Sequence, residues 1–301
     1  MFSYPVVVTV LLTTLLIPSN VIASDHHVVQ NHVLQDTEAD ASISRPRSLK
    51  GSSSSSKSSS SKGKGGSSAN TGSKPDDSAT VGATGLSFDT SDTALLVIDP
   101  QNDFLSPDGV TWGIVGDSVT EHNTVNNLLT LFQTAKAEGY VVAVSPHWYF
   151  PTDLEWEFEG TVEKVMHDIK MFQRMGPLNL DGFEGSGADW LPVLKPYIED
   201  GKTIIMNPHK VYGPETNDTV LQLRKRKIDR VILAGMSANL CVESHMRELV
   251  EQGFDVTVVS DGTAGAITPD LGDGYMSALI NFRFIANAVV TTEEAVAAMT
   301  S

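Results

Sequence analysis

The sequence has 301 residues, a formal net charge of −16 at pH 7 and a single cysteine. One cysteine excludes an internal disulfide, so the fold must depend on its hydrophobic core. Residues 85–301 hold 14 basic and 31 acidic side chains, and this balance argues against binding to nucleic acid or to an anionic membrane.

Residues 1–23 have the features of a secretory signal peptide. An apolar run covers residues 5–17, and small residues then lead to Ala23. We expect cleavage after Ala23 and a secreted protein, with no membrane association afterwards because the apolar run is short for a bilayer. A signal anchor and an intracellular protein with a misread targeting segment are the alternatives. A mature terminus at Ser24 would exclude the intracellular protein.

Residues 24–84 are predicted to be a disordered linker. The segment 50–84 consists almost entirely of Ser, Gly, Lys, Ala and Thr, which cannot bury enough apolar surface to offset its chain entropy. Modified serines among these lysines could bind polyanions or mineral. A plain solvated spacer is the favoured interpretation.

Residues 85–301 are predicted to form one α/β domain. Short β-branched runs indicate strands at residues 93–98, 140–145, 203–206, 230–233, 254–259 and 288–290. Helical patterns cover residues 120–138, 217–227, 240–252, 272–284 and 292–299. Apolar strands that alternate with amphipathic helices predict a three-layer α/β/α fold, with a doubly wound parallel sheet of about six strands.

The carboxyl ends of these strands carry the candidate functional residues. Asp99 follows the first strand, and His147 and Trp148 follow the second. His209 and Lys210 follow the third, and Cys241 opens the helix after the fourth. Ligands bind at the carboxyl ends of the strands in such sheets. An acid, a base and a thiol are therefore expected at one edge.

This set of residues can perform nucleophilic catalysis. A cysteine at a helix start lies near free backbone N–H groups, and with a nearby lysine this favours the thiolate. Asp99 can take the thiol proton and return it to a leaving group. Taken singly, Asp99 as a turn residue and Lys210 as a solvated charge are the favoured interpretations, and Cys241 could be a packed side chain. Their convergence favours catalysis.

Three segments resemble the isochorismatase-like cysteine hydrolases, which include nicotinamidases, N-carbamoylsarcosine amidases and ureidoacrylate amidases. They are TALLVIDPQNDFL (93–105), HKVYGPETNDTVLQLRKRKIDRVILAG (209–235) and VILAGMSANLCVESHMRELVEQGFDVTVVSDGTAG (231–265). The resemblance runs from about residue 88 to the end of the chain. It implies the isochorismatase-like hydrolase fold.

The resemblance also implies a catalytic triad of Asp99 as base, Lys210 as supporting cation and Cys241 as nucleophile. A non-prolyl cis peptide between Met236 and Ser237 would aim the Ser237 N–H beside the Cys241 N–H as an oxyanion hole. The implied reaction is hydrolysis of a small amide-like C–N substrate through a thioester. No cofactor is expected.

Two departures from the family narrow this expectation. Members that hydrolyse isochorismate carry a small, non-nucleophilic residue in place of Cys241, which disfavours isochorismatase activity proper. Nicotinamidases bind a metal through an aspartate and histidines after the second strand, where this chain has His147 and Tyr149. We therefore expect no metal, and nicotinamide is not the leading substrate.

The substrate pocket is harder to predict. Phe104, His147, Trp148 and Tyr212 are candidate lining residues, with ordinary packing as an equal alternative. The long segment 150–190 is expected to form a lid or subunit contacts, and we expect a homo-oligomer.

Three further residues are interpreted as structural. They are His209, His245 and Asn217, whose glycosylation sequon coincides with a predicted helix start that it could cap. A non-catalytic secreted binding or scaffold protein is the competing function. The presence of Asp99, Lys210 and Cys241 together argues against it.

Overall fold

The computed structural model describes residues 85–301. The predicted signal peptide (1–23) and the predicted linker (24–84) lie outside the described residues, so both stay predictions. In the described part of the chain, no helix has the length and apolar character required to cross a bilayer.

The centre of the fold is a six-stranded parallel sheet in the order β3-β2-β1-β4-β5-β8. Its strands are β1 (Thr93–Ile98), β2 (Val141–Ser145), β3 (Ile204–Ile205), β4 (Arg230–Gly235), β5 (Asp255–Thr263) and β8 (Ala288–Val290). A small hairpin of β6 (Ile267–Thr268) and β7 (Gly272–Asp273) lies outside it. The predicted parallel sheet of about six strands is confirmed.

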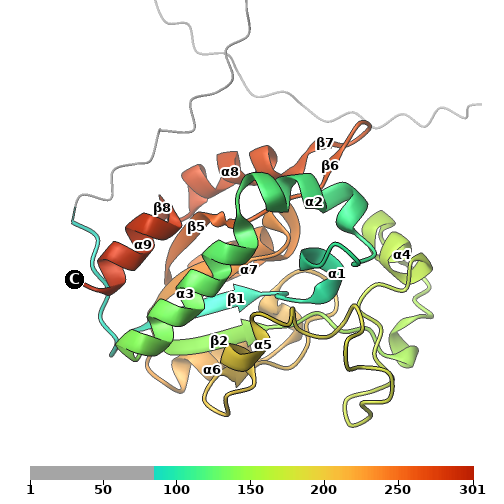
Figure 1. The fold of residues 1–301 in the computed structure, drawn as a ribbon, viewed down its shortest axis with the longest axis horizontal. Helices are drawn as coiled ribbons and strands as arrows, with labels where there is room; N and C mark the ends of the chain where they lie inside the picture. Colours follow the sequence, from blue (N-terminus) through green and yellow to red (C-terminus); the bar gives the residue numbers. More distant parts are fainter. Residues whose placement is uncertain (1–84) are drawn as a thin grey trace, which may run out of the picture. The chain divides into compact units, whose positions relative to one another are not determined.

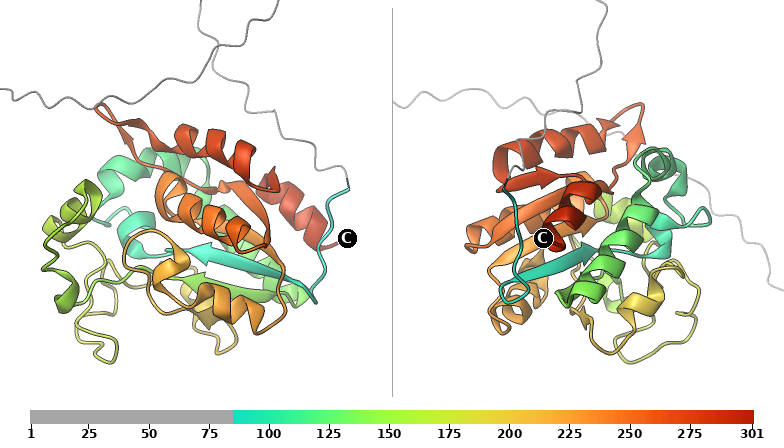
Figure 2. Two further views of the ribbon diagram at one scale, coloured as in Figure 1. Left: turned by 180° about the vertical axis from the view of Figure 1, so that it is seen from behind. Right: turned by 60° about the vertical axis from the view of Figure 1, so that its left-hand side comes forward.

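Helices cover both faces of the sheet (Figures 1 and 2). The α-helices are α1 (Asn102–Leu105), α2 (Trp112–Glu121), α3 (Thr124–Glu138), α4 (Thr161–Asp168), α5 (Lys195–Ile198), α6 (Thr219–Arg224), α7 (Glu243–Glu251), α8 (Gly274–Ile285) and α9 (Thr292–Met299). Short 3-10 turns η1 (Pro151–Asp153) and η2 (Pro214–Thr216) and a π-helical turn η3 (Ala238–Val242) complete the chain. Helices α3 and α9 pack on one face, and α7 and α8 on the other.

The two faces of β1 explain why its sequence is continuously apolar. Leu95 and Val97 belong to the core cluster under α3 and α9, whereas Leu96 and Ile98 belong to the cluster under α7 and α8. All six residues of the strand are buried. A strand that is covered on both sides has no solvent face to mark with polar residues.

Some predicted elements differ from the observed ones. The helix expected at 120–138 is interrupted at Asn123, whose φ of 53° ends α2 and begins α3. Asparagine accepts this left-handed conformation at low cost. The helix expected at 217–227 is shorter, and Lys227 with φ of 60° follows it.

The long segment 150–190 lies beyond the carboxyl end of the sheet and carries η1 and α4 (Figure 1). The buried Asp103 of α1 anchors it, because its carboxylate accepts a 2.7 Å hydrogen bond from the Phe172 N–H. Burial raises the pKa of Asp103, and the Phe172 and Val110 N–H groups oppose that rise. The insertion is thereby attached next to the end of β1.

Candidate functional site

Four buried side chains meet where four neighbouring strands end. Asp99 follows β1, His147 follows β2, His209 lies beyond β3, and Cys241 lies in η3 after β4. All four are 0% exposed, and one ligand atom from each lies within 4.8 Å of the others. Because β3, β2, β1 and β4 are adjacent in the sheet, their carboxyl ends bring these side chains together.

One carboxylate oxygen of Asp99 is hydrogen-bonded, and the other has no hydrogen-bond partner. Its Oδ1 accepts a hydrogen bond from His209 Nε2 at 2.9 Å, while Oδ2 is buried without a hydrogen-bond partner. The residue also has a φ of 45°, an uncommon left-handed conformation. One carboxylate oxygen is therefore available for the neighbouring thiol.

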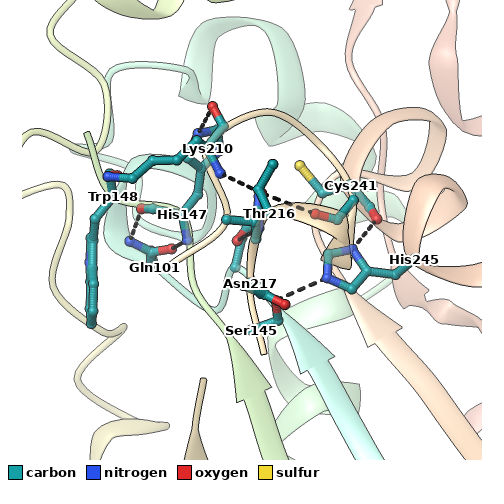
Figure 3. Close-up of polar contacts among 12 residues, drawn as sticks. Gln101, Ser145, His147, Trp148, Lys210, Thr216, Asn217, Cys241 and His245 are labelled. Carbon is teal, nitrogen blue, oxygen red and sulfur yellow. Dashed lines mark hydrogen bonds and ion pairs between the residues drawn. The ribbon is translucent and has the colours of Figure 1, made fainter. Parts of the chain in front are cut away.

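Lys210 does not lie in this cluster. Its ammonium donates to the Trp148 carbonyl at 2.7 Å and to the Asp153 carboxylate, and lies 3.6 Å from the centre of the Phe150 ring. Figure 3 shows the side chain extending towards Trp148 and away from Cys241. Burial lowers the pKa of Lys210, and the Asp153 carboxylate opposes that change.

The position beside Asp99 that was expected for Lys210 is taken by His209. His209 pairs in a parallel bridge with His147, so the chain is extended at this point. Neighbouring residues in an extended chain point to opposite sides. Since His209 faces Asp99, Lys210 faces away from it.

The turn that carries Cys241 is held by a chain of buried hydrogen bonds (Figure 3). His245 Nδ1 donates to the Cys241 carbonyl at 2.7 Å, Ser145 Oγ donates to His245 Nε2 at 2.9 Å, and Asn217 Nδ2 donates to Ser145 Oγ at 2.8 Å. Burial, followed by the charge of His209, lowers the pKa of His245 to about 3. His245 is thus a neutral ring that ties η3 to β2.

The environment of the Cys241 thiol corrects one expectation from the sequence. Burial and the neighbouring Asp99 carboxylate raise the pKa of Cys241 well above its ordinary value. The backbone N–H groups of Ser237 and Cys241 lower that pKa, but by less. The expectation that the helix start favours a resting thiolate was wrong, because full burial outweighs the backbone dipoles. The Met236–Ser237 peptide is cis, as the resemblance implied.

Two tyrosines lie near the cluster. Tyr149 and Tyr212 are buried or half-buried, and Tyr212 is hydrogen-bonded to Glu163 of α4. Burial raises the pKa of both phenols, and the charges of Glu163 and Cys241 add to that rise. Glu163 thereby links the insertion to the tyrosines near Cys241.

The nearest described cavity stops short of the cluster. It has a volume of about 230 Å³ and is lined by Tyr149, Phe150 and residues of the insertion. The ring of Tyr149 also lies 4.5 Å from the His147 ring. Tyr149 therefore stands between this cavity and the buried cluster.

Of the remaining pocket candidates, Phe104 and Trp148 pack elsewhere. Phe104 lies edge-on against Phe172 with ring centres 5.2 Å apart. Trp148 donates from its indole nitrogen to the Ala188 carbonyl at 2.9 Å, and the Arg174 guanidinium lies over its ring. The contacts of Phe104 agree with the packing alternative, whereas Trp148 also lines a cavity of about 470 Å³ beside Phe183 and Trp190.

The sequence reasoning missed Gln101. Its side chain donates to the carbonyl groups of His147 at 3.0 Å and Ala188 at 2.8 Å, and accepts from the His147 N–H at 3.0 Å. Gln101 thus joins the segments after β1 and β2 (Figure 3). The sequence feature that could have indicated this role is a polar residue two positions after Asp99, directly beyond a buried strand.

Asn217 acts at the start of α6. Its side-chain oxygen accepts from the Thr219 N–H at 3.0 Å, but the residue at the N-cap position is Asp218, so Asn217 is not the cap that the sequence suggested. Its amide nitrogen is occupied by Ser145.

The two residues after β2 that stand where nicotinamidases carry metal ligands have other contacts. His147 turns into the cluster with Asp99 and Cys241, whereas the Tyr149 phenol donates to the sulfur of Met166 at 3.6 Å. A phenol engaged in this way does not replace a histidine ligand.

The chain resembles known proteins over the whole of this domain. Residues 93–294 match the Isochorismatase domain. The ureidoacrylate amidohydrolase RutB of Variovorax paradoxus is 24% identical over 182 residues, which are 59% of this chain and 71% of the relative. An Arabidopsis thaliana protein named "Probable inactive nicotinamidase" is 27% identical over 188 residues, covering 60% of this chain and 83% of that protein.

A solved structure of a cysteine hydrolase from Pseudomonas syringae pv. phaseolicola has the same fold. The TM-score is 0.56 at 22% sequence identity, and the alignment covers 72% of this chain and 98% of the other. The domain match, the parallel sheet and the cluster at its carboxyl edge agree, and this chain belongs to the isochorismatase family of hydrolases.

Proposed function

We propose that the protein is a cysteine hydrolase that cleaves a small amide-like C–N bond through a thioester on Cys241. The proposal rests mainly on one observation. An Asp99 carboxylate oxygen without a hydrogen-bond partner lies beside the buried Cys241 thiol. The similarity to RutB, which is named for amide hydrolysis of ureidoacrylate, supports the same class of substrate.

The chemistry begins with a neutral thiol and an ionised carboxylate. Asp99 Oδ2 takes the proton as the Cys241 sulfur attacks the carbonyl carbon, which forms the C–S bond and places negative charge on the carbonyl oxygen. The N–H groups of Ser237 and Cys241, which face the sulfur, would stabilise that charge. Asp99 then protonates the leaving nitrogen as the C–N bond breaks.

The second half of the reaction releases the acid. Asp99, again a carboxylate, takes a proton from a water molecule that attacks the thioester carbon. The C–S bond breaks and the proton returns to the Cys241 sulfur. The balance is one water consumed for one carboxylic acid and one amine or ammonia.

His209 is a positioning residue in this scheme. Its 2.9 Å hydrogen bond to Oδ1 orients the Asp99 carboxylate so that Oδ2 points to the thiol. It takes the place that the resemblance had assigned to Lys210.

Variants at both reacting residues test the proposal. With a panel of amides, carbamoyl compounds and ureido acids, we expect the wild-type chain to release ammonia or amine from at least one member. Cys241→Ala should abolish that turnover. Asp99→Asn should lower it by roughly 100-fold or more, since it removes the proton acceptor.

A slow substrate should also leave an acyl group on Cys241 that mass spectrometry detects. Circular dichroism and thermal unfolding control for folding of both variants. Turnover that survives in a folded Cys241→Ala protein would exclude the nucleophile.

A further inference from the structure

The cluster at the carboxyl edge of the sheet is also a set of metal ligands. Asp99, His147, His209 and Cys241 offer one oxygen, two nitrogens and one sulfur, all within 4.8 Å of one another. We propose that these four side chains bind one divalent transition-metal ion of the Zn²⁺ class. The site is different from the nicotinamidase type, because it uses Asp99 and Cys241 themselves.

The type of donor selects the ion. Thiolate and imidazole ligands suit Zn²⁺ and its neighbours, whereas Mg²⁺ and Ca²⁺ require oxygen ligands. Two neutral histidines, one carboxylate and one thiolate carry two negative charges, which a divalent ion neutralises. Binding replaces the thiol proton of Cys241 with the metal, and the proton leaves to solvent.

The spacing is close to that of a tetrahedral site. Metal–ligand bonds of about 2.0 to 2.3 Å place tetrahedral ligand atoms about 3.3 to 3.6 Å apart. The present limit of 4.8 Å therefore requires only that the farthest pair approach by about 1 Å. Rotation of a histidine or cysteine side chain can supply a shift of this size.

Unpaired polar atoms supply independent support. Asp99 Oδ2, His147 Nδ1 and His209 Nδ1 are buried without a hydrogen-bond partner. His147 Nε2 already donates to the Lys210 carbonyl, and His209 Nε2 donates to Asp99, so each ring in its neutral form has a lone pair at Nδ1. Buried polar atoms are normally paired. Three of the four candidate ligands therefore carry an unpaired acceptor atom, as expected for a metal-binding site without its ion.

Metal binding would block the proposed reaction. A sulfur bonded to the metal cannot attack a carbonyl, and Asp99 could no longer take its proton. The ion would thus act as a reversible inhibitor, because it prevents Cys241 from acting as a nucleophile. This consequence rests on the proposed function, but the binding itself does not.

Cobalt provides a direct test, because a cobalt–thiolate bond gives a charge-transfer band in the near ultraviolet. The full chain is first treated with a chelator and then equilibrated with Co²⁺ by long dialysis, since the site is buried. We expect one Co²⁺ per chain, the charge-transfer band, the visible spectrum of a tetrahedral ion, and displacement of cobalt by Zn²⁺.

Variants assign the ligands. Cys241→Ser should remove the charge-transfer band, and His147→Ala and His209→Ala should each weaken Co²⁺ binding by at least about tenfold. His122→Ala is the matched control, because His122 stacks on Tyr275 with ring centres 3.8 Å apart, outside the cluster, and should bind like wild type. Absence of the band in the wild-type chain, or unchanged binding in both histidine variants, would overturn the site.

The experiments distinguish failure of the metal-site proposal from failure of the proposed function. Turnover by the chelator-treated chain, with loss in Cys241→Ala, supports the hydrolase whatever cobalt does. Cobalt binding in a chain that turns over none of the substrates supports the metal site alone. Where both hold, added Zn²⁺ should inhibit turnover and a chelator should restore it.

Discussion

Two adjacent residues, His209 and Lys210, have opposite environments. His209 is fully buried and bonded to Asp99, whereas Lys210 is bound to Asp153 and Trp148. A lysine beside the carboxylate would be a permanent cation. A histidine is a directional donor whose charge depends on its surroundings.

This difference predicts unequal effects of substitution on turnover. With a chelator present throughout, His209→Ala should lower kcat by roughly 100-fold, since Asp99 loses the group that orients it. Lys210→Met should lower kcat by less than about tenfold, because its ammonium contacts neither Asp99 nor the thiol. Steady-state kinetics of both variants provide the measurement.

A conservative variant separates orientation from folding. His209→Gln retains an N–H donor and should recover part of the kcat that His209→Ala loses. If Lys210→Met lost as much kcat as His209→Ala, the lysine would be the catalytic group and its side chain would have to turn inward during the reaction.

Helix α4 is connected to the site through Tyr212. Glu163 on this helix is hydrogen-bonded to Tyr212, whose phenol interacts electrostatically with the fully buried Cys241. A substrate can reach the sulfur only when the surrounding side chains move. We propose that the insertion of residues 150–190 acts as a lid, one of the two roles expected from its length.

The lid predicts the reactivity of the only thiol in the chain. Tyr212→Phe leaves the Glu163 carboxylate without its phenol partner, which should favour opening by about 1 kcal/mol and speed iodoacetamide labelling of Cys241 about fivefold. The rate is read by mass spectrometry under native conditions.

Lys164→Ala is the control on the same helix, because Lys164 is exposed and contacts Asp168 at 3.7 Å. Its labelling rate should equal that of the wild-type chain. Equal rates for Tyr212→Phe and wild type would show that α4 does not limit access to Cys241.

For the molecule as a whole, the hydrophobic core extends to the first residues of the described chain. Leu86 and Phe88 pack against the core under α3. The Phe88 backbone bonds to the Ala298 carbonyl at 3.3 Å and accepts from the Tyr140 hydroxyl at 3.1 Å. The segment before β1 is therefore part of the folded domain.

Two truncations test where the domain begins. A chain that starts at residue 85 should unfold with the same free energy as one that starts at residue 24. A chain that starts at residue 93 loses the packing of Leu86 and Phe88, which should reduce the free energy of unfolding by about 2 kcal/mol or more. Urea unfolding followed by tryptophan fluorescence measures the difference. A loss of stability already at residue 85 would place part of the core earlier in the chain.

Secretion, cleavage after Ala23 and a homo-oligomeric state stay predictions of the sequence. Sequencing of the mature terminus tests the first two, and light scattering of purified protein tests the third.

Local patterns predicted much of the fold from the sequence. The bounds of β1, β8 and α9 agree with the observed Thr93–Ile98, Ala288–Val290 and Thr292–Met299, because hydrophobic periodicity is a property of neighbouring residues. Asp99 and Cys241 were also found locally, since each directly follows the predicted end of a strand or opens the next helix.

Tertiary structure alone decided the rest of the site. The choice between His209 and Lys210 depends on the pairing of His147 with His209, which a single segment does not contain. The raised pKa of Cys241 depends on its complete burial and on the Asp99 carboxylate, which comes from a strand end 142 residues earlier in the chain. The sequence determines which groups reach one edge of the sheet. Long-range packing determines which of these groups face one another and how far each is exposed to water, because strand register and burial arise only between distant segments.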